Sequence, residues 1–447
     1  MLEAFVNAFK IPELRKRILF TLGALVVYRI GCYIPTPGID GKALAEFFER
    51  IKQTQGGTLF GIMNMFSGGA MERLTIFALG IMPNISASII LQLLTAVFPY
   101  FEKLAKEELG RKKLVEYTRY GTVLLGIIQS LFISLWLENP QHFQGMQIVA
   151  HPGWSFRLLT IITLTTGTTF IMWLGEQISD RGIGNGMSLI ITIGITSRIP
   201  TAVYQLFLLL SPFSPTKRQL QPIVVLIMAV LLIAVTVAVI IITQAQRKIP
   251  VQYAKRIIGH RMYGGQSTYL PLRINQAGVI PIIFAQSIIL FPATLASFIP
   301  NPKFQALATQ LLRGHWLYTI LYTILIIFFS YFYTAVTFNP IEISENMQRF
   351  GGFIPGVRPG KSTSDYLDYV MTRVTLAGAL SLAAIAIFPD LIGAWLKVPY
   401  LIASFFGGTA LLIIVGVILD TVRQVESHLL MRHYEGFMKK GKVKGRR

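Results

Sequence analysis

Long stretches without a charged residue constrain the fold of this 447-residue chain more than any other feature. A helix that crosses a bilayer needs about 20 mostly apolar residues. Hydrophobic residues make up 53% of the chain and charged residues 14%, a balance that a soluble fold could not bury. Seven stretches without Asp, Glu, Lys or Arg are long enough to cross: 74–101, 120–137, 158–175, 219–246, 274–302, 314–341 and 398–419. The chain is therefore predicted to be an all-α polytopic membrane protein.

Three weaker stretches complete the predicted set of spans. Residues 18–34 are interrupted by Arg29, residues 187–207 by Arg198, and residues 374–389 form a short apolar run. Ten transmembrane helices result, although nine or eleven stay open. Because charge at membrane depth is costly, the two arginines are expected to lie or pair at helix ends rather than to serve in a relay.

Basic residues predict the orientation of these spans. With ten spans, the segments on the side of the N-terminus hold 29 of the 41 Lys and Arg residues. Inner loops of membrane proteins retain Lys and Arg, so both termini are predicted to lie inside. Much of the formal net charge of +20 then lies on one face. That face either sets the topology and attracts anionic lipid, or docks an acidic or RNA-containing partner.

The predicted spans divide near residue 215 into two groups of five. An odd number of spans per group gives the groups opposite orientations, the arrangement of an inverted repeat with a pathway at its interface. No residue-level repeat accompanies this topology, so the alternative that the two halves are not a repeat stays open. The predicted organisation is an inner N-terminal segment (1–17), a first half (18–215), a second half (216–423) with inner loops near 246–273 and 339–373, and a basic tail (424–447).

Titratable residues avoid the predicted spans. No Asp or Glu lies in the middle of a span, and the six His lie in loops or at span edges. Proton-coupled transporters and intramembrane enzymes need such groups on facing helices, so both classes are disfavoured. No metal site or cofactor is predicted, and no GxxxxGK[ST] signature is present, so energy has to come from a partner. The chain is not expected to be an enzyme.

Residues 56–71, GGTLFGIMNMFSGGAM, form an apolar, glycine-rich segment that is too short to span. A short helix between glycines could fold back into a cavity lined by protein, where irregular backbone is shielded from lipid. The alternative is an outer loop, although a loop in water rarely exposes so many large apolar side chains together. The composition favours the re-entrant structure modestly.

A series of motifs resembles the SecY family of protein-conducting channels. The motifs are NMFSGGA at 64–70, RLTIFALGIMPNISASIILQLLT at 73–95, RGIGNG at 181–186, YAKR at 253–256, QSTYLPL at 266–272, AGVIPIIFAQSIILFP at 277–292, FNP at 338–340, PGVRPG at 355–360 and GGT at 407–409. They follow the order of the family over nearly the whole chain. The resemblance implies ten helices in two inverted five-helix halves around a central pore, with a plug and a lateral gate.

The resemblance implies a passive channel that threads unfolded polypeptides outward or releases them sideways into lipid. In the family a ring of apolar side chains forms the constriction, and an apolar constriction blocks ions by dewetting. Motif alignment places this pore ring at Ile81, Ile85, Met187, Ile191, Ile283 and Ile413. Met187 departs from the usual branched aliphatic residue, and Asn84 stands where the family more often has an aromatic residue. Without the resemblance, the ring residues would be assigned to ordinary helix core.

The plug and the lateral gate of the family are also implied by motif alignment. The plug, a short half-helix, falls on Gly61, Ile62, Met63, Asn64, Met65, Phe66, Ser67, Gly68, Gly69 and Ala70. The gate lies between spans two and three and spans seven and eight, and falls on Ser86, Gln92, Gln129, Gln286 and Phe291. A seam of hydrogen bonds worth about 1 kcal/mol each could hold the gate shut and still yield to a signal peptide. Helix packing is the alternative role for these polar residues.

The family uses its inner loops and basic tail to dock the SecA motor ATPase or the translating ribosome with its nascent chain. The docking residues implied here are Arg358, Arg247, Lys248, Lys255, Arg256 and Arg261. For residues 439–447, a disordered basic end is an equal alternative. The resemblance further implies SecE-type and SecG-type membrane subunits, signal peptides and unfolded polypeptides as substrates, contact with membrane lipids, and a place in the bacterial cytoplasmic membrane with both termini cytoplasmic.

Overall fold

Helices make up most of the computed structural model, which describes residues 11–54, 64, 67–143, 146–210, 222–253, 256–258, 261–263, 267–298, 316–396 and 408–440. The first half contains α2 (Pro12–Gly31), α3 (Gly41–Thr54), α5 (Met82–Val97), α6 (Pro99–Lys106), α7 (Glu108–Glu138), the 3-10 helix η1 (Pro140–Phe143), α8 (Trp154–Arg181), α9 (Gly186–Thr196) and α10 (Ile199–Leu210). The second half contains the helices α11 (Pro222–Gln244), α12 (Ile280–Phe298), α14 (Trp316–Thr337), α15 (Pro340–Arg349), α16 (Lys361–Leu396) and α18 (Gly408–Lys440). Its strands are β1 (Gln246–Tyr253), β2 (Arg256–Ile258), β3 (Arg261–Tyr263), β4 (Ser267–Arg273) and β5 (Gly352–Phe353).

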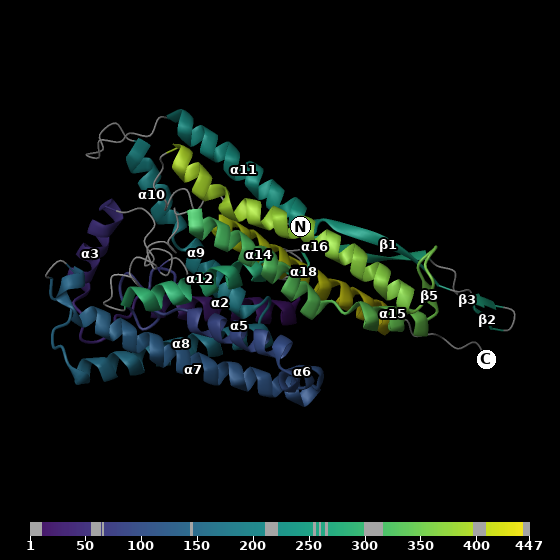
Figure 1. The fold of residues 1–447 in the computed structure, drawn as a ribbon, viewed down its shortest axis with the longest axis horizontal. Helices are drawn as coiled ribbons and strands as arrows, with labels where there is room; N and C mark the ends of the chain where they lie inside the picture. The colour runs from purple at the N-terminus through teal and green to yellow at the C-terminus, as the bar shows by residue number, and fades with distance from the viewer. Residues whose placement is uncertain are drawn as a thin grey trace.

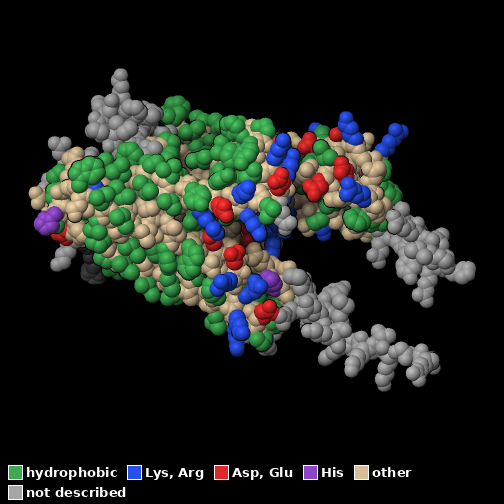
Figure 2. Space-filling view, turned by 90° about the horizontal axis from the view of Figure 1, so that it is seen from below, with side chains coloured by type: hydrophobic (Ala, Val, Ile, Leu, Met, Phe, Trp, Pro, Cys, Tyr) green, Lys and Arg blue, Asp and Glu red, His purple; other side chains and the backbone are tan. Residues whose placement is uncertain are grey.

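Each of the ten predicted spans overlaps at least one helix among the described residues. Within the described residues, seven helices are long and apolar enough to cross a membrane, and an eighth results if the bent pair α5–α6 counts as one span. The other two predicted spans are occupied by α2, whose first turns are basic, and by α12, whose apolar part is Ile280–Ala293. Hydrophobic side chains cover a broad region of the surface, whereas charged side chains gather mostly toward one end (Figure 2). This is the surface of a multi-pass membrane protein, with lipid around the apolar region.

The helix of the second span begins later than the sequence predicted. Within the uncharged stretch 74–101, α5 has only 16 residues, and α6 turns away from it by 103°. The residues before α5 are irregular and bond instead to the segment after α2, where Thr36 N–H donates to the carbonyl of Leu74 (3.0 Å). Pro83 lies in the first turn of α5, a position that proline favours, but the prediction of the span followed the uncharged run and did not use this signal.

The helices α7 and α8 form a hairpin that is clamped at both ends. At one end, two guanidinium nitrogens of Arg119 donate to the two carboxylate oxygens of Glu176, at 3.0 and 2.9 Å. At the other end, Arg157 donates to Glu138 (2.8 Å). Bidentate arginine–carboxylate pairs fix orientation as well as distance. The hairpin is therefore a stiff unit, seen along one edge of the molecule in Figure 1.

The two long loops of the second half pack against each other at the polar end of the molecule. Strands β1 and β4 pair antiparallel, and β5 from the second loop adds to the free edge of β1. Their side chains share a small separate core with α16, composed of Ile249, Leu272, Phe338, Ile354, Leu367, Val370 and Met371. The sequence analysis located both loops but did not predict this sheet. The fold class is all-α in the spans, with a three-stranded sheet outside them.

Both halves contribute to the main core. The α7–α8 hairpin lies along one edge in Figure 1 and α11 along the opposite edge, with α9, α12, α14 and α18 between them. Side chains of α5, α9, α12 and α18 belong to one buried cluster. The last helix also continues past the predicted tail boundary at residue 424 without a break, and its Val425 packs with Leu14 and Ile183.

Candidate functional site

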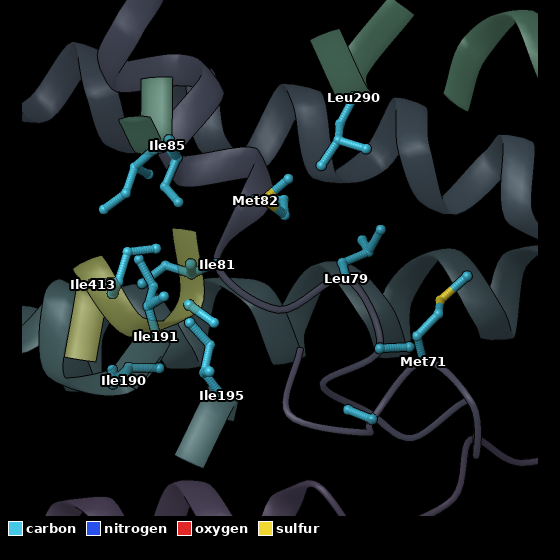
Figure 3. Close-up of a cluster of buried hydrophobic side chains, with 14 of the residues drawn as sticks. Met71, Leu79, Ile81, Met82, Ile85, Ile190, Ile191, Ile195, Leu290 and Ile413 are labelled. Carbon is cyan, nitrogen blue, oxygen red and sulfur yellow. The ribbon is translucent and has the colours of Figure 1, made fainter. Parts of the chain in front are cut away.

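Five isoleucines of the predicted pore ring lie in one buried cluster. Ile81, Ile85, Ile191, Ile283 and Ile413 are at most 8% exposed. They come from the turn before α5 and from α5, α9, α12 and α18, so both halves of the chain contribute. Figure 3 shows the side chains of Ile81, Ile191 and Ile413 beside one another, with Ile85 close by. The result is an apolar junction between the halves.

The RGIGNG motif positions the two ring residues of α9. Asn185 caps this helix by accepting a hydrogen bond from the backbone N–H of Ser188 (3.1 Å). A Cβ atom on Gly186 would collide with the carbonyl oxygen of Gly175, so only glycine permits this close crossing of α8 and α9. The crossing brings Met187, one residue later, into contact with the main core.

The same motif also joins two other elements, which were not predicted from the sequence. The backbone N–H of Ile183 donates to the hydroxyl of Thr21 in α2 (3.0 Å). The backbone N–H of Gly184 donates to the side chain of Gln424 in α18 (2.8 Å). Nothing in the local sequence of either partner distinguishes it from other helix residues. The motif therefore ties the first half to the last helix of the second half.

The two residues that depart from the family pattern contact each other. The amide nitrogen of Asn84 lies 3.6 Å from the sulfur of Met187. The amide oxygen of Asn84 accepts from the hydroxyls of Ser88 and Thr122, both at 3.4 Å. Asn84 is only 5% exposed, so its carboxamide links α5, α7 and α9 inside the protein. Both departures were noted from the sequence, but their contact was not.

Part of the predicted plug is described, and that part is buried. Asn64, Ser67 and Ala70 are at most 3% exposed. This burial does not fit the alternative of an exposed outer loop for these residues. The predicted plug residues Gly61, Ile62, Met63, Met65 and Phe66 lie outside the described residues.

Two arginines contact the region around the plug. A guanidinium nitrogen of Arg29 donates to the carbonyl of Gly68 (2.8 Å). A guanidinium nitrogen of Arg198 lies 3.7 Å from a carboxylate oxygen of Glu72. The expectation that both arginines pair at helix ends is confirmed. Their partners were not predicted, because both partners are distant in sequence.

The predicted gate residues lie on elements that meet between the halves. Ser86 and Gln92 are on α5, Gln129 is on α7, and Gln286 and Phe291 are on α12, which packs against both α5 and α7. Gln286 is 1% exposed, and neither of its amide atoms has a hydrogen-bond partner among the described residues. The expected hydrogen-bonded seam is therefore not formed by Gln286. A buried amide without partners is costly, and such groups concentrate where a structure rearranges or binds.

The predicted docking residues lie at the polar end. Arg247 and Lys248 are exposed on β1, and Arg358 is exposed in the turn between β5 and α16. Arg256 and Arg261 lie on the paired strands β2 and β3, whereas Lys255 lies outside the described residues. The Arg358 turn is fixed, because its carbonyl accepts from Thr363 (2.8 Å) and the carbonyl of Gly360 accepts from Ser344 (2.6 Å).

No group of His, Cys, Asp or Glu that could hold a metal ion is present among the described residues. The candidate site combines the apolar junction of the five isoleucines with an exposed basic end.

Comparisons with known proteins place this geometry in context. The SecY family model matches residues 75–422. The protein translocase subunit SecY of Escherichia coli strain K12 is 48% identical over 438 residues, covering 97% of this chain and 96% of the relative. The protein translocase subunit SecY of Aquifex aeolicus is 44% identical over 442 residues, covering 98% and 100%.

Solved structures share the fold. A protein-conducting channel superimposes with a TM-score of 0.65 at 18% identity, covering 98% of this chain and 99% of that chain. Sec61 of the canine ribosome–channel complex superimposes with a TM-score of 0.62 at 18% identity, with the same coverage. Together with the family match, these likenesses confirm the predicted fold class.

Proposed function

This chain belongs to the SecY family, and on that premise we propose that it is the central channel-forming subunit of a protein translocase. It passes unfolded secretory polypeptides across a membrane, releases membrane segments sideways into the bilayer, and performs no chemistry of its own. The relatives at 44–48% identity are protein translocase subunits, and the alignments cover nearly their whole length. The observation that carries the proposal is the apolar junction of Ile81, Ile85, Ile191, Ile283 and Ile413 between the two halves.

The junction suits a constriction that seals without gripping. Aliphatic side chains offer neither charge nor hydrogen bonds to a passing chain, so they fit around diverse sequences and hold none of them tightly. A narrow apolar ring also favours dewetting, which blocks ions. Met187 completes the ring as a flexible side chain that fills irregular gaps.

The segment 61–70 serves as the plug in this proposal. Its described residues are buried beside α2 and α9, next to the elements that carry the ring. One structural neighbour is a SecY protein whose plug domain stabilises the closed state of the channel, which makes the same role reasonable here.

The lateral gate is assigned to the contact of α12 with α5 and α7. The seam carries Ser86, Gln92, Gln129, Gln286 and Phe291. An unpartnered amide such as Gln286 weakens the closed seam and offers hydrogen bonds to an entering signal peptide. Opening there exposes a translocating segment to membrane lipid.

The partners follow from the family and from the basic face. We assign Arg358, Arg247, Lys248, Lys255, Arg256 and Arg261 to the docking of a SecA-type motor ATPase or a ribosome with its nascent chain. SecE-type and SecG-type subunits complete the assembly in the bacterial cytoplasmic membrane, with both termini cytoplasmic. Two structural neighbours are channels bound to ribosomes, which supports the ribosome as a partner. Such docking should weaken with salt, since it is largely electrostatic.

Reconstitution tests the proposed function. The chain is placed in liposomes with SecE-type and SecG-type subunits, a SecA-type motor, ATP and a precursor protein. Protection of the precursor from added protease, dependent on ATP and on this chain, is the expected result. Absence of protection with an assembled complex and an active motor would contradict the proposal.

A further inference from the structure

The side chain of Glu72 connects the predicted plug to the break between α9 and α10 in the fifth predicted span. The Asn64 side chain donates to the carboxylate of Glu72 (2.8 Å) and accepts from its backbone N–H (3.0 Å). The same carboxylate oxygen of Glu72 lies 3.7 Å from the guanidinium of Arg198, which stands between α9 and α10. The two charged side chains are only 22% and 13% exposed, respectively.

Asn64 and residues 67–72 are joined by hydrogen bonds into one unit, here called the plug turn. The Asn64 carbonyl accepts from the backbone N–H of Gly69 (2.9 Å), and the Ser67 hydroxyl accepts from that of Met71 (3.1 Å). Together with the two bonds between Asn64 and Glu72, these contacts hold the two ends of the turn to each other. The end of the plug and Glu72 should therefore move as one body.

A second arginine contacts the same turn from α2. Arg29 donates to the carbonyl of Gly68 (2.8 Å), and the Tyr28 hydroxyl donates to that of Ser67 (3.4 Å). Gly68 has a φ of +66°, and a Cβ atom there would lie 3.0 Å from the Cα of Gly194 in α9. The turn therefore packs against α9. Arg29 contacts it at Gly68, and Arg198 contacts it at Glu72.

The free-energy cost of a charge among spanning helices explains why such contacts would hold a movable element. An arginine among spanning helices is costly, so its charge needs a partner. A shielded ion pair contributes little beyond its desolvation cost, but replacing one partner by the opposite charge places two like charges side by side in a shielded place, which is strongly unfavourable. The contact therefore opposes displacement of the turn, and it can reform when the turn returns.

We propose that Arg198, acting through Glu72, and Arg29, acting on Gly68, are positioning residues that hold the plug in its closed place. The inference rests on the proposed function and adds a regulation to it. The threshold for channel opening is set by the contacts of these two arginines with the plug turn. Neither arginine needs to touch the translocating polypeptide.

Charge exchange tests the proposal in the reconstituted complex. The variants are Glu72→Arg, Arg198→Glu and the double variant with both changes, with Glu72→Gln as a nearly isosteric alternative. The readouts are ion conductance in planar bilayers without substrate, ATP-driven precursor transport, and thermal stability. Each single variant should raise the resting conductance several-fold, and the double variant should return it near the wild-type level.

The Arg157–Glu138 pair supplies a matched control. It is a shielded arginine–glutamate pair, 27% and 10% exposed, at the α7–α8 hairpin rather than at the plug. Arg157→Gln should cost similar thermal stability but leave the resting conductance unchanged. This separates a specific effect on the plug from general loosening of the fold.

Three outcomes would overturn the proposal. One is wild-type resting conductance in the single variants, including Glu72→Gln. Another is a double variant that leaks as much as the single variants. The third is an equal leak in Arg157→Gln. In each case precursor transport by the wild-type complex would leave the proposed function standing, whereas its absence would remove the proposed function itself.

Discussion

Asn84 and Met187 show how two unusual residues in one chain can depend on each other. A methionine in the pore ring has more rotatable bonds than a branched aliphatic residue, so its position is less defined by its own rotamers. The Asn84 amide at 3.6 Å from the Met187 sulfur supplies an external restraint. Ser88 and Thr122 in turn orient the Asn84 side chain.

We predict that Asn84→Leu raises the resting ion conductance of the reconstituted channel in the wild-type background. The free energy of unfolding should fall by about 1–2 kcal/mol, since buried hydrogen bonds contribute about 1 kcal/mol each. In a Met187→Ile background the same change should have little effect on conductance, because isoleucine is stiff and accepts no hydrogen bond.

A double-mutant cycle on planar-bilayer conductance and chemical denaturation measures this coupling. Thr236→Ala, which removes a hydroxyl that donates to the carbonyl of Leu232 within α11, is the control. Equal increases in conductance in both backgrounds would show that Asn84 does not position Met187.

Arg358 differs from Arg247 and Lys248 in lying in a turn rather than on a strand, and the backbone of this turn is fixed. Its turn is held by Thr363 and Ser344, so its side chain is presented from a rigid base. We predict that Arg358→Glu reduces motor-driven export several-fold and reduces membrane insertion less. Export of a precursor and insertion of a membrane segment, measured in the same proteoliposomes, test this.

Arg349 offers the comparison for this prediction. It is also exposed at the polar end, at the end of α15, where it pairs with Glu345 one helical turn away. Arg349→Glu changes the net charge equally and should affect export less. Equal loss of export and insertion in Arg358→Glu would remove its specific role with the motor.

At the scale of elements, the predicted plug and the predicted gate differ in the contacts that hold them in place. The turn at 64–72 contacts two arginines, whereas the seam of α12 with α5 and α7 includes the buried, unpartnered amide of Gln286. The α7–α8 hairpin is clamped at both ends and should move as a unit. Gate opening is therefore expected to separate α12 from this hairpin rather than to bend the hairpin.

Deletion of residues 61–70 removes the predicted plug and part of the turn. We predict a several-fold rise in ion leak through planar bilayers, with protein export largely retained, because the apolar ring and the docking face are untouched. Deletion of 256–263, at the tip of the β1–β4 hairpin, is the control and should lower export without raising the leak. An unchanged conductance after plug deletion would count against the plug assignment.

At the scale of the whole molecule, the chain separates its surfaces by chemistry. Figure 2 shows an apolar region next to a charged end, and the two long loops build a sheet with its own small core at the polar end. That core holds the exposed residues of β1 and the Arg358 turn in one rigid body. A partner that docks there would exert force on β1, which directly follows the spanning helix α11, and on α16, which is itself a spanning helix.

The sequence alone located seven spans as stretches without charge, a local property that a bilayer requires of each helix separately, and three more as weaker apolar runs. The count of ten and the candidate ring, plug and docking residues were predicted from motifs carried in family order. Two features were not predicted: the helix of the second span begins only at Met82, because the preceding backbone bonds to the segment after α2, and the loops form strands because β1, β4 and β5 meet.

Only the tertiary structure decided which side chains act together. Arg29 and Gly68, Glu72 and Arg198, and Asn84 and Met187 are pairs whose members lie on different elements. Hydropathy indicates which segments a bilayer can surround, and motif order indicates the family. Neither contains information on which face of one helix meets which face of another. Those pairings follow from packing the two halves against each other, which is a property of the whole chain.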